Sequence, residues 1–86
     1  MHTAELLREA LETARQCGYE IRQDWLGGDG GGHCLVRGRK WLLLDMAQSA
    51  NEQLDIVAAA LRGERAATQI DMSSELANRL DVRSAA

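Results

Sequence analysis

The first third of the chain changes from a helical to an alternating hydrophobic pattern near Gly18. Apolar residues recur every three or four positions over residues 3–17, which predicts an amphipathic helix that ends at this glycine. Over residues 19–26 apolar and charged residues alternate, which predicts a half-buried strand. Tyr19 and Trp25 lie on the apolar side of that strand, so we expect the helix to pack against them.

Two short apolar segments, residues 33–37 and 41–45, follow and are separated by the Gly38-Arg39 turn. A two-residue connection that begins with glycine is typical of a type II′ turn, so the segments are expected to form an antiparallel hairpin. The expected register pairs three sets of residues, namely Val36 with Trp41, Leu35 with Leu42, and Cys34 with Leu43.

Both faces of this hairpin are predicted to be apolar, because side chains alternate along a strand and hydrophobic residues occupy most positions. One face carries Cys34, Val36, Trp41 and Leu43, and the other carries Leu35, Leu42 and Leu44. A hairpin that is apolar on two sides has to be covered on two sides. Either the helices divide between the two faces, or a second subunit covers one of them.

The second half of the chain is predicted to be helical. Ser49-Ala50-Asn51-Glu52 matches a capping box, and the apolar stripe that follows predicts a helix near 50–62. Residues 64–69 are expected to be a connection that leads through a short extended segment to a last helix near 74–81. With an antiparallel sheet of about three strands, near 19–26, 33–37 and 41–45, these helices define an α+β fold.

Size and charge narrow the classes of function. The 86 residues are expected to form a single domain, 1–86, whose packing is anchored by the only aromatic residues, Tyr19, Trp25 and Trp41. The formal net charge is −3, whereas nucleic-acid binders usually carry a basic excess that neutralises phosphates. No apolar stretch approaches the roughly 20 residues that cross a bilayer. We therefore expect no nucleic-acid or membrane partner and a cytoplasmic location.

A glycine-rich segment, residues 27–32, is predicted to be a loop, because its five glycines are too flexible for a helix or strand. Backbone N–H groups of such loops can bind anions, and three cationic residues follow at the hairpin tip. The candidate anion-binding residues are Gly30, Gly31, Arg37, Arg39 and Lys40. However, the loop leads into a strand and lacks the Lys-Ser/Thr of a phosphate loop, which favours a simple turn.

The two cysteines, Cys17 and Cys34, are expected to be free thiols, since the chain shows no export signal. His33 and Cys34 are adjacent, and adjacent strand residues point to opposite faces, so they are not expected to share a metal ion. Cys34 is expected to be a small core residue, with a thiol or metal function as the alternative. No two carboxylates are spaced for acid–base catalysis. The sequence thus predicts no catalytic residue, metal site or cofactor.

A resemblance to a protein family rests on four segments of the chain: Gly18-Tyr19-Glu20-Ile21-Arg22, Gly31-Gly32-His33-Cys34-Leu35-Val36-Arg37-Gly38, Trp41-Leu42-Leu43-Leu44-Asp45 and Glu52-Gln53-Leu54. With these segments the chain resembles, over about residues 5–80, a family of short bacterial proteins with no established activity. The resemblance implies no mechanism.

A more distant resemblance is to metallopeptidase-like domains of the ImmA/IrrE type, in which strands precede a helix that carries a His-Glu-x-x-His zinc motif. The corresponding helix, residues 53–61, contains no histidine and offers no zinc ligand pair. This resemblance therefore implies a relative without peptidase activity.

Taken together, the patterns predict a non-catalytic protein-interaction module that associates with itself or with another protein. The candidate interaction residues are Leu35, Leu42, Leu44 and Trp41 of the hairpin. The alternative is a small binder of an anionic metabolite or nucleotide, which would use the 27–32 loop and the cations of the hairpin tip.

Overall fold

A computed structural model of the chain describes residues 2–28 and 30–80. The elements follow in the order α1 (Thr3–Gln16), β1 (Tyr19–Asp24), β2 (Gly32–Val36), β3 (Arg39–Asp45), α2 (Ala50–Arg62), the 3₁₀-helix η1 (Arg65–Gln69) and α3 (Ser74–Leu80). The α+β class predicted from the sequence is confirmed. The final position predicted for the last helix, residue 81, lies outside the described residues.

The three strands form a mixed sheet in the order β1-β3-β2, rather than the antiparallel sheet that was predicted. The central strand β3 runs antiparallel to β2 and parallel to β1, with register from Tyr19 opposite Lys40 to Asp24 opposite Asp45. The prediction was wrong because β2 does not pair with β1. The chain passes through residues 25–31 before β2 begins, and the position beside β1 is taken by β3, which runs in the same direction.

The hairpin of β2 and β3 is confirmed, but its turn lies one residue earlier than predicted. The turn residues are Arg37 and Gly38, which both have positive φ (52° and 79°), as a type I′ turn requires. Trp41 consequently lies opposite Cys34 instead of Val36, a shift of two residues. A shift of two leaves every side chain on its predicted face, because side chains alternate with period two.

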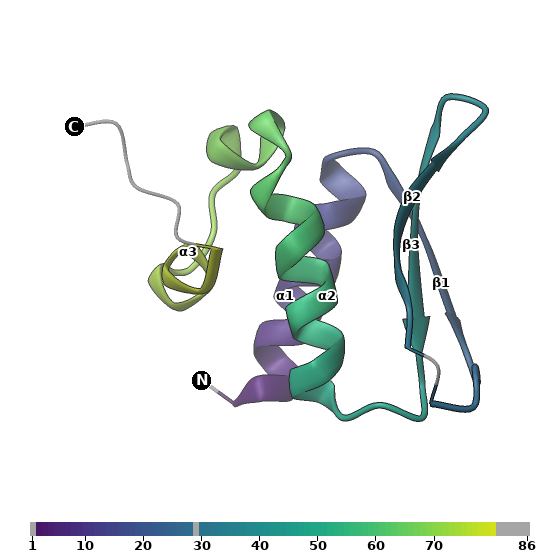
Figure 1. The fold of residues 1–86 in the computed structure, drawn as a ribbon. Helices are drawn as coiled ribbons and strands as arrows, with labels where there is room; N and C mark the ends of the chain where they lie inside the picture. Colours follow the sequence, from purple (N-terminus) through teal and green to yellow (C-terminus); the bar gives the residue numbers. More distant parts are fainter. Residues whose placement is uncertain (1, 29, 81–86) are drawn as a thin grey trace.

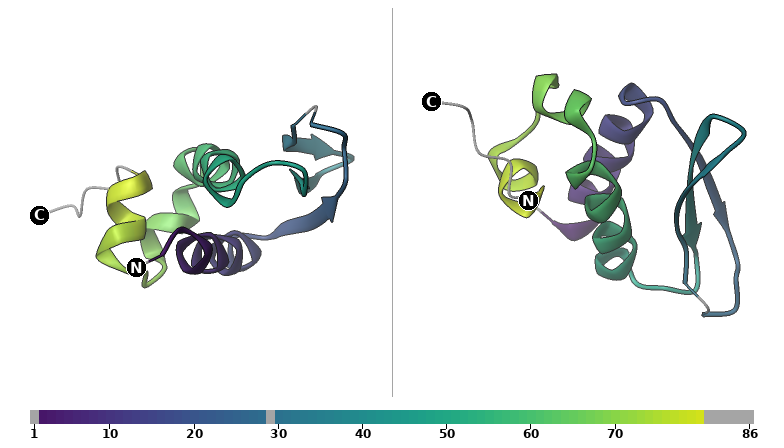
Figure 2. Two further views of the ribbon diagram at one scale, coloured as in Figure 1. Left: turned by 90° about the horizontal axis from the view of Figure 1, so that it is seen from below. Right: turned by 45° about the horizontal axis from the view of Figure 1, so that its top comes forward.

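Both long helices lie on the same face of the sheet (Figure 1). Helices α1 and α2 pack side by side against it, and α3 packs on the side of this helical layer that is turned away from the sheet, as the two further views also show (Figure 2). The opposite face of the sheet, which we call the outer face, is not covered by any of the described elements. The helices therefore do not divide between the two faces of the hairpin.

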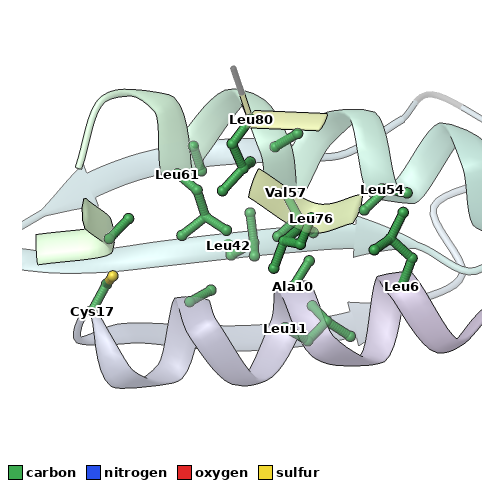
Figure 3. Packing of buried hydrophobic residues seen from close by; sticks show 14 of the residues in the cluster. Leu6, Ala10, Leu11, Cys17, Leu42, Leu54, Val57, Leu61, Leu76 and Leu80 are labelled. Carbon is green, nitrogen blue, oxygen red and sulfur yellow. The ribbon is translucent and has the colours of Figure 1, made fainter. Parts of the chain in front are cut away.

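The core consists of leucine and alanine side chains from the helices and the inner face of β3 (Figure 3). Ala10 and Ala14 of α1 and Ala58 of α2 are completely buried, and such small residues let two helix backbones approach closely. Of the three aromatic residues predicted to anchor the packing, only Tyr19 packs against the core, where it is partly buried. The prediction was wrong for Trp25 and for Trp41, which lies on the outer face. Trp25 is 73% exposed because β1 ends at Asp24, so the alternating pattern does not extend to it.

Side-chain caps connect the helices to their surroundings. The predicted capping box is present, with Ser49 Oγ accepting a hydrogen bond from the backbone N–H of Glu52 at 3.1 Å. Ser73 caps α3 in the same way, and both its hydroxyl and its backbone N–H donate to the Glu9 carboxylate of α1 (2.6 and 2.7 Å). The connection before α3 is partly the 3₁₀-helix η1, where a simple connection and a short extended segment were predicted.

Candidate functional site

The outer face of the sheet is the candidate interaction site. By strand alternation and register it carries Glu20, Arg22 and Asp24 of β1, Trp41 and Leu43 of β3, Arg39 at the start of β3, and Cys34 and Val36 of β2. The apolar side chains lie on the central strand and on β2, while the charged ones lie on β1 and at the hairpin end. The face is therefore an apolar strip with a charged border.

The charged border consists of two exposed ion pairs. Arg39 lies 3.3 Å from Glu20, and Arg22 lies 3.6 Å from Asp24. Exposed pairs of this kind contribute little to stability, typically less than about 1 kcal/mol. They are thus free to rearrange when another surface approaches.

An open pocket of about 260 Å³ lies where β1 and β3 end. Its lining residues are Arg22, Asp24, Leu26, Leu43 and Leu44. The adjacent Trp25 does not line this pocket and projects into solvent. Sequence reasoning did not identify this pocket, because it depends on β1 lying beside β3. The alternation of Arg22 and Asp24 was visible, but their neighbour Leu43 was not.

The structure separates the predicted interaction residues. Leu42 and Leu44 are completely buried beneath the helices, so they are not available to another chain, and their assignment as interaction residues was wrong. Leu35 shares their side of the hairpin but lies on the edge strand β2, and it remains 69% exposed. Trp41 lies on the outer face and is partly buried. Leu42 and Leu44 are more deeply buried than Trp41 because both long helices cover the face of the sheet that carries Leu42.

The two cysteines occupy different environments. Cys17 is buried at the end of α1, and burial, with a further contribution from the nearby Glu64 carboxylate, raises the pKa of its thiol. Cys34 is exposed on the outer face, so its prediction as a core residue was wrong. Both thiols are free.

The glycine loop already surrounds an anion that belongs to the chain. The carboxylate of the buried Asp45 accepts four backbone hydrogen bonds, from Leu26 (3.0 Å), Gly28 (2.9 Å), Gly30 (3.1 Å) and Ala47 (2.9 Å). Burial alone raises the pKa of this carboxyl, but the four bonds favour the charged form and hold the pKa below its usual value. No functional role was predicted for Asp45 from the sequence, whereas the structure places it at the centre of the loop's hydrogen bonds. The sequence did contain a signal for this role, namely an aspartate at the end of an apolar strand in a chain that also has a glycine-rich loop.

Gly31 has a steric role in the same loop. A Cβ atom at this position would lie 1.9 Å from the carbonyl oxygen of Leu43. The close approach of the loop to β3 therefore requires glycine. Two of the proposed anion-binding glycines, Gly30 and Gly31, are thus explained by the internal structure of the loop; Asp29 lies outside the described residues.

The three candidate cations do not converge on the loop. Lys40 Nζ donates to the carbonyl oxygen of Cys17 and to Glu64 Oε2, each at 2.5 Å. Its hydrogen bond to Glu64 raises the pKa of the lysine more than partial burial lowers it. Arg39 pairs with Glu20, and Arg37 lies in the exposed turn. The arrangement offers no shared anion site to these residues.

Among residues 2–28 and 30–80, no group of three or more His, Cys, Asp or Glu side chains is placed to hold a metal ion. Over the same residues, none of the helices has the length and apolar character needed to span a membrane. Comparisons with protein-family models, with curated proteins and with solved structures give no match, so neither resemblance stated above gains support from them.

Proposed function

We propose that the chain is a non-catalytic protein-interaction module that forms a homodimer through the outer face of its sheet. The observation that carries the proposal is the uncovered apolar strip of Trp41 and Leu43 on the central strand. A sheet that packs helices on one face usually presents polar residues on the other. Here the centre of the outer face is apolar, which favours contact with another protein surface.

A small core supports the same proposal. A chain of this size buries a limited fraction of its surface, and association is a common additional source of stability. Homodimers with two-fold symmetry are the most frequent assemblies of soluble proteins. Dimerisation would thus cover an exposed apolar surface and add to the stability of the folded chain.

The alternative function, binding of an anionic metabolite or nucleotide, finds less support. The amides of Gly28 and Gly30 donate to Asp45, and Lys40 is engaged by Glu64. An external anion would have to displace a buried carboxylate from the loop. We therefore favour the homodimer.

Light scattering coupled to size-exclusion chromatography tests the proposal over a wide range of protein concentration. We expect a dimer whose population rises with concentration, and a monomer at every concentration would refute the homodimer. Leu43→Glu should weaken association because it places a charge in the apolar strip. Leu35→Glu is the matched control, since it makes the same change on the opposite face of the hairpin and should leave association intact. Circular dichroism establishes that both variants fold.

A further inference from the structure

We propose that Trp25 of each copy enters the pocket of the other copy in this dimer, and that Arg22 and Asp24 exchange their ion pair across the two-fold axis. This inference rests on the proposed homodimer and specifies its contacts. The pocket is the one lined by Arg22, Asp24, Leu26 and Leu43; Leu44 also lines it but is completely buried, so it offers no accessible surface to the ring.

Trp25 lies beside an open apolar pocket. It is 73% exposed in the single chain, although tryptophan is among the residues enriched at the energetically dominant positions of interfaces. A cavity of about 150 Å³ accommodates benzene, so a pocket of about 260 Å³ has room for an indole ring. In a two-fold interface the same patch of both copies is in contact, so the projecting ring of each copy can fill the pocket of the other.

Arg22 and Asp24 give the patch a charge pattern that is complementary to a second copy of itself. Arg22 and Asp24 lie two residues apart on the outer side of β1, at the rim of the pocket, and are 3.6 Å apart. Across a two-fold axis each arginine faces the partner's aspartate, so the patch complements itself. Like charges therefore do not come into contact. The two ion pairs of the separate copies, one in each, are replaced by two pairs between the copies.

The outer face of the sheet is small compared with a standard protein interface. Three strands about 4.8 Å apart and about 20 Å long span a flat area of roughly 300 Å², whereas a standard interface buries about 800 Å² on each partner. The sheet face alone is therefore too small. The contact has to extend to an adjoining segment, and residues 25 and 26 are the segment beside the pocket.

The backbone on both sides of Trp25 is fixed before association. The N–H of Trp25 donates to Asp24 Oδ1 at 2.8 Å, and the N–H of Leu26 donates to the buried Asp45 at 3.0 Å. A ring held on a fixed backbone loses little conformational entropy on binding. Trp25 is thus prepared to act as an anchor.

A charge-exchange experiment tests the pairing. Arg22→Asp and Asp24→Arg each place like charges across the axis, so each variant alone should dissociate about tenfold more readily than the unmodified chain. An equimolar mixture of the two should form a heterodimer, because its cross-axis pairs are again opposite in sign. Sedimentation velocity would measure both effects. If the mixture stays as dissociated as the separate variants, the exchanged ion pair is refuted.

Fluorescence tests the burial of the ring. Trp41→Phe leaves Trp25 as the only tryptophan but changes a residue of the apolar strip, so light scattering first has to show that this variant dimerises like the unmodified chain. The emission of Trp25 should then move to shorter wavelength as concentration rises and the dimer forms. Trp25→Ala should weaken association about 30-fold. At a dilution where both proteins are monomeric its melting temperature should be unchanged, since the residue is exposed in the single chain. A dimer by light scattering without an emission shift would refute the inference while the proposed function stands. A monomer at every concentration would refute both.

Discussion

The Asp45 carboxylate lies 3.1 Å from the backbone nitrogen of Gly30, fifteen residues earlier in the chain. With the N–H groups of Leu26, Gly28 and Ala47 it completes a set of four backbone donors around one buried carboxylate. Gly28 and Gly30 both have positive φ (86° and 79°), a conformation that glycine adopts without strain. The glycines let the loop turn its donors towards Asp45, and Asp45 fixes the loop beside the end of β3.

Asp45→Asn should destabilise the fold. An asparagine amide has one oxygen, and its NH₂ group would face donors instead of acceptors. Because a buried donor left without a partner is costly, we expect the melting temperature to fall by about 10 °C or more. Thermal unfolding followed by circular dichroism measures the change. Asp71→Asn, at an exposed position, is the control, and equal melting temperatures for both variants would contradict the proposed role of Asp45.

Stability should also fall in acid in a way that depends on Asp45. Its folded-state pKa is lowered below the unfolded value of about 3.9, because the four backbone bonds outweigh the cost of burial. The stabilisation is therefore complete above the unfolded pKa and is lost as the pH falls through the folded pKa. Urea unfolding between pH 7 and pH 2.5 should show a difference between the unmodified chain and Asp45→Asn that narrows in acid. A constant difference would show that the carboxylate charge is not responsible.

The sequence was informative where the signal is local. The period of the hydrophobic pattern identified the helices and strands, and alternation placed Leu42 and Trp41 on opposite faces, as the structure has them. It was not informative about which face the helices cover, because this depends on contacts far apart in the chain. The buried role of Leu42 follows from that choice. The parallel pairing of β1 with β3 likewise joins segments far apart in the chain, whereas Trp25 is exposed because β1 ends at Asp24.

The candidate site was predicted only in part for the same reason. The apolar character of Trp41 and its neighbours was visible in the sequence, and this strip is the centre of the outer face. The pocket was not visible in the sequence, since its lining residues come from β1, the segment after β1 and β3. The donors of the glycine loop were visible too, but their acceptor, Asp45, lies up to 19 residues away.

Gly31→Ala should be far more damaging than Gly32→Ala. The added Cβ at position 31 would lie 1.9 Å from the Leu43 carbonyl oxygen, so the loop or β3 has to move. At position 32 no atom lies within 4 Å of the added Cβ, and φ is not positive. We expect the first substitution to lower the free energy of unfolding by about 2–3 kcal/mol and the second to change it by less than about 1 kcal/mol. Chemical denaturation of the two variants measures both values, and similar losses would show that the loop does not press against β3.

Lys40 and Glu64 should show a favourable coupling in a double-mutant cycle. Lys40 Nζ bridges the carbonyl oxygen of Cys17, at the end of α1, and Glu64, two residues after the end of α2. Both side chains are only partly exposed (34% and 20%), so solvent screens the pair less than it screens a surface pair. The cycle of Lys40→Met and Glu64→Gln should give a coupling of about 1 kcal/mol in the free energy of unfolding. The exposed pair of Arg39 and Glu20 provides the comparison and should give less, so equal couplings would contradict a bridging role for Lys40.

Leu42→Ala should lower the free energy of unfolding much more than Leu35→Ala, because only Leu42 is buried although both residues lie on the inner side of the hairpin. Leu42 is completely buried between the sheet and the helices, so truncation should cost about 2–5 kcal/mol of unfolding free energy through lost burial and the cavity left behind (Figure 3). Leu35 lies on the same side but at the open edge of β2, where its side chain is mostly exposed, and the same truncation should cost less than about 0.5 kcal/mol. Urea unfolding of the dilute protein, where association does not contribute, measures both changes. Helix α2 lies close to β2 but leaves the Leu35 side chain mostly exposed. If Leu35→Ala were as costly as Leu42→Ala, that side chain would have to be covered, and Leu35→Glu would no longer serve as a neutral control for the outer face.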